Sequence, residues 1–203
     1  VLEALGTGLK PPIAIAREVG IANTHVGKYL STLMDLRFVR RIISVDVRNV
    51  GNTRRSRYEI RDPYLQFYYR FVAANLDLLE QDRIDRLMTL ITEGLPAYVG
   101  KTGFEELARR RITVLGDTNQ LSFIPERVGR IWTRSVEIDV AAVEKRSRNA
   151  LLAECKWTSR KTDESTLNSL IERGNQLPKL KDYAIRYALF SKAGFTDDLA
   201  ALA

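Results

Sequence analysis

Three charged residues, Asp139, Glu154 and Lys156, have the types and spacing of a site that acts on phosphate with the help of a divalent cation. Glu154 and Lys156 lie two residues apart in the apolar run ALLAECKWT, which is typical of a buried strand. They therefore share one face of that strand, and Cys155 points to the opposite side. Asp139 lies in the preceding run, VEIDVAAVE, and can reach the same face if the two runs form a hairpin.

Charged side chains in the middle of an apolar sheet are costly unless a metal ion or mutual pairing compensates them. Carboxylate oxygens suit Mg²⁺ or Mn²⁺, which keep several waters and bridge to phosphate oxygens. We expect Asp139 and Glu154 to hold Mg²⁺ or Mn²⁺, which activates a water, while Lys156 orients that water or stabilises the developing charge. Glu105 adds a third carboxylate, and Gln176 steadies the lysine or the water. The alternative is a structural ion pair of Lys156 with Asp139 or Glu154.

The elements that position these residues can be read from the apolar patterns between 95 and 203. They are a helix over 98–115, strands over 127–133, 136–144 and 150–158, a helix over 163–178, a strand over 184–191 and a closing helix over 195–203. The order α-β-β-β-α-β predicts a mixed sheet covered by helices, as in the PD-(D/E)XK (restriction-endonuclease-like) fold. On the first helix we expect Phe104, Leu107 and Ala108 to be buried.

Residues 1–62 predict a winged helix-turn-helix, which gives the whole chain a mixed α+β class. PPIAIAREVG is typical of a short helix, and HVGKYLSTLMDLR, capped by Asn23 or Thr24, predicts the recognition helix. FVRRIISVDV and RYEIRDP, on either side of the basic turn RNVGNTRRS, predict a hairpin, the wing. Residues 63–94 follow as a helical connector, whose aromatic stripe we interpret as core.

The positive charge of the chain is concentrated in this first part. Residues 1–72 carry 12 Lys and Arg against 6 Asp and Glu, whereas residues 73–203 carry 20 against 19. Clustered cations bind a phosphate backbone by releasing its condensed counterions. The residues expected to contact DNA lie on the exposed side of the recognition helix and along the wing: Asn23, Thr24, His25, Lys28, Thr32, Arg48, Arg54, Arg55 and Arg57. The alternatives are a protein-docking or spacer module that binds no DNA, and a basic face that serves solubility or binds an acidic protein.

The composition of the chain is that of a globular protein and argues against disulfide-rich and membrane-spanning classes. The chain has 203 residues, 45% of them apolar and 28% charged, which is ordinary for a globular protein. A single cysteine excludes an intramolecular disulfide and fits a reducing compartment, so we expect a cytoplasmic location. No apolar run approaches the roughly 20 residues that span a bilayer, so no membrane partner is expected. The sequence opens without methionine and within a helical pattern, which indicates a piece of a longer protein.

Four segments together carry a resemblance to a known family: RYEIRDPYLQFYYRFV, YVGKTGFEELARRR, GRIWTRSVEIDVAAVE and LLAECKW. From about Ile13 to Phe190 the chain resembles the C-terminal half of a family of archaeal and bacterial AAA+-type ATPases. In that family a P-loop ATPase domain precedes a winged helix and the DEXX-box ATPase C-terminal domain. The resemblance implies a PD-(D/E)XK nuclease-like last domain, with its motif residues at Glu105, Asp139, Glu154 and Lys156.

The resemblance also implies that ATP binds only in a domain that this chain lacks, and that any homo-oligomer forms through the full-length ATPase. The expected function is therefore the DNA-binding and metal-dependent DNA-cleaving portion of such an ATPase. The sequence leaves open whether the chain is an enzyme. The alternatives are a non-catalytic DNA- or protein-binding regulatory module attached to an ATPase, and a purely structural cluster of charges.

Overall fold

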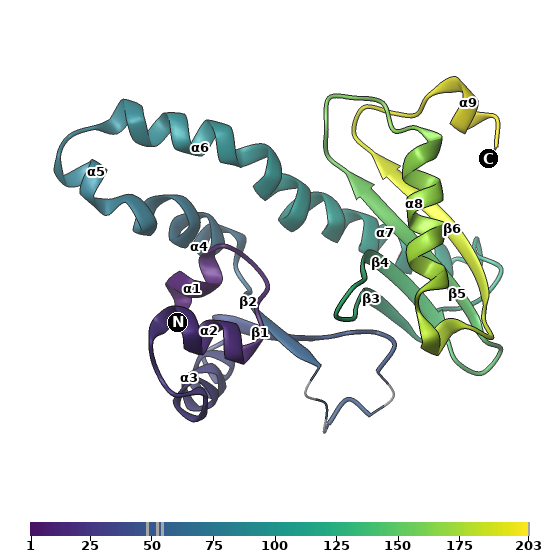
Figure 1. Ribbon diagram of the computed structural model, residues 1–203, viewed down its shortest axis with the longest axis horizontal. Helices are drawn as coiled ribbons and strands as arrows, with labels where there is room; N and C mark the ends of the chain where they lie inside the picture. The colour runs from purple at the N-terminus through teal and green to yellow at the C-terminus, as the bar shows by residue number, and fades with distance from the viewer. Residues whose placement is uncertain (48, 52, 54, 203) are drawn as a thin grey trace. The chain divides into compact units, whose positions relative to one another are not determined.

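The computed structural model describes residues 1–47, 49–51, 53 and 55–202, which fall into two compact units (Figure 1). The first unit comprises Val1–Ile43 and Asn49–Leu95, and the second comprises Ser44–Arg48 and Pro96–Ala203. Both units combine helices with a β-sheet, so the predicted mixed α+β class is confirmed. Within the described residues, no helix is long and apolar enough to cross a membrane.

The first unit opens with three helices and an antiparallel hairpin. These are α1 (Leu2–Gly6), α2 (Pro12–Val19), α3 (Asn23–Asp35), β1 (Val39–Ile43) and β2 (Ser56–Ile60). Gly20 ends α2 in the left-handed conformation, at a φ of 74°, which glycine adopts without strain. The shared core consists of Ala4, Leu5, Ile15, Ala16, Val26, Leu30, Val39 and Ile60. The element order is the one predicted for residues 1–62.

The predicted cap of α3 is wrong. Ala22, in an extended conformation, is the N-cap, and it makes no side-chain cap hydrogen bond. Its carbonyl accepts from the amides of His25 and Val26 at 2.9 and 3.2 Å, so Asn23 already lies inside the helix. The helix therefore starts one residue earlier than a cap at Asn23 predicts, and two earlier than a cap at Thr24 predicts.

The rest of the first unit is helical but irregular. It contains α4 (Pro63–Phe67), a π-helical turn η1 (Tyr68–Val72), a 3₁₀ turn η2 (Ala73–Asn75), α5 (Leu76–Glu80) and most of α6 (Ile84–Val99). Helical turns thus continue without interruption from Pro63 to Glu80, as predicted for the connector, but the π-helical turn changes the spacing of the residues. Phe71 is buried, whereas Tyr64 is 73% exposed, so only part of the predicted aromatic stripe is core.

The second unit is built on a mixed four-stranded sheet in the order β3-β4-β5-β6. The strands are β3 (Arg127–Trp132), β4 (Glu137–Glu144), β5 (Asn149–Lys156) and β6 (Ala184–Ser191). The first three are antiparallel neighbours, and β6 is parallel to β5. A parallel pair needs a crossover, which α8 (Glu164–Asn175) and η4 (Pro178–Leu180) supply. With η3 (Gly100–Phe104), α7 (Glu105–Asp117) and α9 (Asp197–Ala200), this reproduces the predicted α-β-β-β-α-β order.

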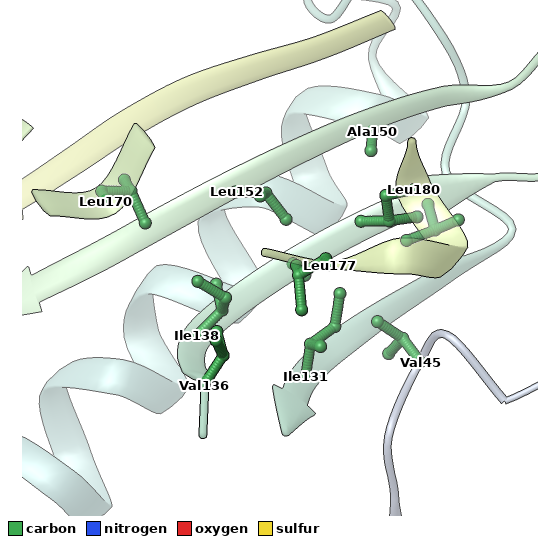
Figure 2. Packing of buried hydrophobic residues seen from close by; sticks show 11 residues of the cluster. Val45, Ile131, Val136, Ile138, Ala150, Leu152, Leu170, Leu177 and Leu180 are labelled. Carbon is green, nitrogen blue, oxygen red and sulfur yellow. The ribbon is translucent and has the colours of Figure 1, made fainter. Parts of the chain in front are cut away.

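Helices cover both faces of this sheet. On one face, Leu170 of α8 packs with Ile138 and Leu152 (Figure 2). On the other face, α7 packs its buried side chains against the residues Val140, Ala142, Leu151 and Ala153. Strands that are buried on both faces have nearly continuous apolar sequences, which explains the runs in β4 and β5.

The burial predicted for α7 is correct at one position and wrong at another. Ala108 is 3% exposed, whereas Leu107 is 62% exposed. The face that α7 turns inward carries Glu105, Ala108, Ile112 and Gly116. The π-helical turn η3 directly precedes α7, so the helical phase assumed across residues 98–115 does not hold.

The predicted first strand of the wing is divided between the two units. Its first half forms β1, whereas Ser44–Arg48 belongs to the second unit. The Val45 amide donates to the Arg130 carbonyl at 3.0 Å, and the Arg127 guanidinium donates to the carbonyls of Val45 and Val47 at 3.2 and 2.9 Å. Val45 is 2% exposed and lies in the core on the α8 side (Figure 2). The first unit ends at Leu95, one residue after the predicted boundary at 94, and the division at residue 62 stays a prediction.

Candidate functional site

Strand β5 places Glu154 and Lys156 on the face covered by α8. Leu152 belongs to the core on that side, and Cys155 packs against the core on the α7 side, which is the predicted alternation. Lys156 Nζ donates to Glu154 Oε1 at 2.7 Å. The Glu154 side chain is 9% exposed and that of Lys156 is 38% exposed. The carboxylate is therefore buried, and its lysine partner reaches the surface.

Asp139 lies where the regular ladder between β4 and β5 ends. The paired register runs from Glu144↔Asn149 to Val140↔Ala153. One residue beyond it, Asp139 Oδ2 accepts a hydrogen bond from the Cys155 amide at 3.0 Å. Burial raises the pKa of Asp139, and the Glu154 carboxylate raises it further, while the bond from the Cys155 amide lowers it. Asp139 and Glu154 are thus close enough to repel each other.

Glu105, the first residue of α7, is the third carboxylate of the cluster. It lies 2.6 Å from the Arg130 guanidinium and 3.6 Å from that of Arg109. Its Oε2 is nevertheless buried and accepts no hydrogen bond from the described residues. Burial raises the pKa of Glu105 to about 7; the Arg130 charge opposes this rise and the Asp139 charge adds to it. The predicted third carboxylate therefore lies within electrostatic range of Asp139.

The raised pKa of Glu105 predicts that the protein loses stability as the pH rises towards neutrality. The folded protein keeps this proton up to about pH 7, whereas a carboxyl group with its ordinary pKa of 4.5 loses it earlier. Unfolding between these pH values releases the proton, so the free energy of unfolding decreases as the pH rises through the window. We expect the melting temperature to fall between about pH 5 and about pH 8, and this component to disappear in Glu105→Gln.

Thermal unfolding followed across this pH range checks the expectation. Glu172→Gln, which changes an exposed carboxylate on α8, is the matched control and should keep the wild-type pH dependence. An identical pH dependence in wild type and Glu105→Gln would contradict the role of Glu105.

Two arginines that the sequence patterns did not single out complete the cluster. Arg173 of α8 donates to Glu154 Oε2 at 2.9 Å. Arg130 of β3 pairs with Glu105. The signal for Arg173 is its place between Leu170 and Gly174, the buried residues of α8, because a charge beside an apolar face needs a partner there.

Gln176 was the residue predicted to reach the site from the helix after β5. It forms the C-cap of that helix and is exposed, and the α8 side chain that contacts Glu154 is Arg173 instead. The role proposed for Gln176 near the lysine or the water stays a prediction.

Two aromatic rings pack together just after the end of β5. Trp157, which follows Lys156, lies 5.1 Å from the Phe104 ring between centroids. Lys192 Nζ lies 4.9 Å from the centroid of the Trp157 ring. Gly100 makes room for this ring, because a Cβ at that position would lie 3.0 Å from the Trp157 Cβ. The Trp157 ring is therefore packed between η3 and Lys192.

The polar side chains predicted to contact DNA from α3 are all exposed. They are Asn23, Thr24, His25, Lys28 and Thr32. Val26 and Leu30 turn inward, so the apolar stripe of this helix was predicted correctly. The Thr32 hydroxyl donates to the Lys28 carbonyl at 3.2 Å, as is common for threonine within a helix.

The predicted wing residues are described only in part. Arg55 and Arg57 are partly buried, and Arg57 lies opposite Ile42 in the hairpin. Arg48 and Arg54 lie outside the described residues. Contact of any of these side chains with DNA stays a prediction.

The carboxylates fit a hard divalent cation by their chemistry. Glu105, Asp139 and Glu154 all offer carboxylate oxygens, which such cations prefer. Glu105 Oε2 is buried and accepts no hydrogen bond from the described residues. The Glu154 charge contributes to the raised pKa of Asp139. Among the described residues, no group of three or more His, Cys, Asp or Glu side chains is gathered closely enough to hold a metal ion. The residues that could hold Mg²⁺ or Mn²⁺ are therefore Asp139 and Glu154, with solvent oxygens completing the coordination.

Comparison with known proteins finds a family model that matches part of this chain. Residues 68–167 match the family DUF234, described as archaeal and bacterial proteins of unknown function, and this range includes the four motif residues. The chain is also 28% identical over 193 residues to the uncharacterized protein MJECL04 of Methanocaldococcus jannaschii. That alignment covers 95% of this chain and 43% of the relative, so the chain spans less than half of the relative's length. No solved structure matches the chain.

Proposed function

We propose that this chain is the nucleic-acid-binding and metal-dependent nucleic-acid-cleaving portion of a larger AAA+-type ATPase. In this proposal the first unit is a winged helix that recruits DNA, and the second is a PD-(D/E)XK nuclease-like domain. The observation that carries the proposal is the convergence of Asp139, Glu154 and Lys156 at one end of the β4–β5 pair, with Glu105 in electrostatic range. The α-β-β-β-α-β order of the second unit supports it.

Each member of the cluster has a defined task in this reaction. Asp139 and Glu154 supply the oxygen ligands for Mg²⁺ or Mn²⁺, which when bound lowers the pKa of a water and polarises the phosphate. Lys156 is fixed by its 2.7 Å bond to Glu154 and keeps solvent access, so its ammonium group can contact a phosphate oxygen or orient the water.

In this proposal the first unit binds the DNA. The exposed polar side chains of α3 suit contacts in a groove of DNA, and the basic excess of residues 1–72 suits the phosphate backbone. Phosphate contacts of this kind weaken as the salt concentration rises. Binding should therefore depend strongly on salt even where no cleavage occurs.

Incubation of the purified chain with plasmid, linear and branched DNA in Mg²⁺ or Mn²⁺ tests the proposal. We expect cleavage that stops on addition of EDTA and in Asp139→Asn. Asp117→Asn, which changes an exposed carboxylate at the end of α7, is the matched control and should cleave like wild type. Cleavage that persists in Asp139→Asn would exclude this site as its source.

A second candidate function is a non-catalytic, DNA-binding regulatory module attached to an ATPase. The observation in its favour is that both oxygens of Glu154 already have cationic partners, Lys156 and Arg173. Ion pairs that are satisfied in this way can be purely structural. Intact DNA binding without cleavage in Mg²⁺ or Mn²⁺ would support this function over the first.

A further inference from the structure

The Glu154 carboxylate is held by cations from two different elements. Oε1 accepts from Lys156 of the same strand at 2.7 Å, and Oε2 accepts from Arg173 of α8 at 2.9 Å. The carboxylate is 9% exposed, so both bonds lie where water screens charge weakly. Hydrogen bonds between ionised groups are about twice as strong as neutral ones. A divalent cation that takes Glu154 as a ligand therefore competes with these partners for the charge and the lone pairs of the carboxylate.

Arg173 is the partner that can be displaced without losing its position. Its Nη1 donates to the Glu137 carbonyl at 2.9 Å, and its Nε donates to the Ser169 carbonyl at 3.3 Å. These bonds hold the guanidinium at the start of β4 independently of Glu154. Its side chain is 26% exposed, so solvent can replace the lost carboxylate. Lys156, in contrast, is needed at Glu154 for the proposed reaction.

We infer that Arg173 is a built-in counter-ion that competes with the divalent cation for Glu154 Oε2. This inference rests on the proposed function and names a residue that determines how tightly the site takes its metal. In the metal-free protein Arg173 keeps Glu154 paired and in place next to Asp139. A bound cation would weaken the Arg173–Glu154 bond by drawing the carboxylate charge towards itself, whereas the bonds of Arg173 to Glu137 and Ser169 would keep the guanidinium close to Glu154.

The other charges around Glu154 do not provide the same competition. The Asp139 and Glu154 carboxylates repel each other, and a bound cation would relieve this repulsion, so Asp139 favours the cation. Arg130 lies against Glu105, where it is paired at 2.6 Å. Removal of the Arg173 charge alone should therefore strengthen metal binding, because both the competing bond and the repulsion between guanidinium and metal disappear.

Titration of Mn²⁺ into the DNA-free chain, by calorimetry and by electron paramagnetic resonance of free Mn²⁺, tests the inference. We expect Arg173→Gln to lower the dissociation constant for Mn²⁺ at least about tenfold, the effect of losing one charged hydrogen-bond partner. Arg160→Gln removes an equal charge at an exposed position of the same unit and should change it less than about twofold. Arg173→Lys keeps the charge and should bind Mn²⁺ more weakly than Arg173→Gln.

The outcomes separate this inference from the proposed function. Equal or weaker Mn²⁺ binding in folded Arg173→Gln, judged by circular dichroism, overturns the inference and leaves cleavage to be judged by its own assay. Tighter binding in Arg173→Gln supports the inference even if the wild type cleaves no DNA, which would overturn only the proposed function. Absence of Mn²⁺ binding in wild type and both variants overturns the inference and the metal-dependent function together.

Discussion

Replacing Lys156 with alanine is expected to slow DNA cleavage about 10²- to 10³-fold while leaving DNA affinity within about twofold, as for removal of one group that stabilises developing charge. The Lys156 side chain is 38% exposed, and Glu154 keeps its bond to Arg173 after the change, so the fold should persist. Single-turnover cleavage in Mn²⁺, beside DNA binding in EDTA, measures the two quantities separately.

Lys161→Ala is the matched control for this prediction. Lys161 lies on the same unit, its side chain is 59% exposed, and it pairs with Asp197 only at 3.8 Å. This variant should cleave at the wild-type rate, because an exposed pair of this kind contributes little. A Lys156→Ala protein that cleaves as fast as Lys161→Ala would assign the lysine a structural role alone.

The convergence of Glu154 and Lys156 was predictable because it depends on local geometry. A strand places residues two apart on one face, and the apolar run around them identified the strand. Asp139 followed from the hairpin formed by two adjacent runs. The exact position of Asp139 depends on where the β4–β5 ladder ends. There its Oδ2 accepts a hydrogen bond from the Cys155 amide. The sequence pattern contains no signal for that hydrogen bond.

The arginines could not be predicted in the same way, because their partners lie far away in the chain. Arg173 reaches Glu154 across 19 residues, and Arg130 reaches Glu105 across a helix and a loop. Which charge on α8 faces the sheet depends on how the helix docks, and that is a tertiary property. Sequence reasoning therefore identified Gln176, three residues further along, as the α8 residue near the site.

The errors in the fold prediction also have physical causes. Leu107 was expected inside because a regular 3.6-residue period was extended through the π-helical turn before α7. The residues after Ile43 continue an apolar pattern, which predicted a longer wing strand. They form no strand: the Val45 amide donates to the Arg130 carbonyl of β3, and Val45 is buried in the second unit. The apolar pattern indicates that Val45 is buried but not which core buries it.

Leu152→Ala is expected to lower the free energy of unfolding of the second unit by about 2–5 kcal/mol, the usual range for a buried leucine. Leu152 is fully buried on the central strand β5, between Leu170 of α8 and Ile138 of β4 (Figure 2). A Cβ added at Gly174 would lie 3.1 Å from the Leu152 Cδ1, so α8 packs closely here and a cavity cannot close easily.

Urea unfolding followed by tryptophan fluorescence measures this effect. The chain has two tryptophans, Trp132 and Trp157, and both lie in the second unit, so the signal reports on that unit. Leu107→Ala removes the same atoms from a side chain that is 62% exposed and should change the free energy by less than about 0.5 kcal/mol. Similar losses in both variants would contradict the packing of β5 against α8, which holds Glu154 and Arg173 within hydrogen-bonding distance.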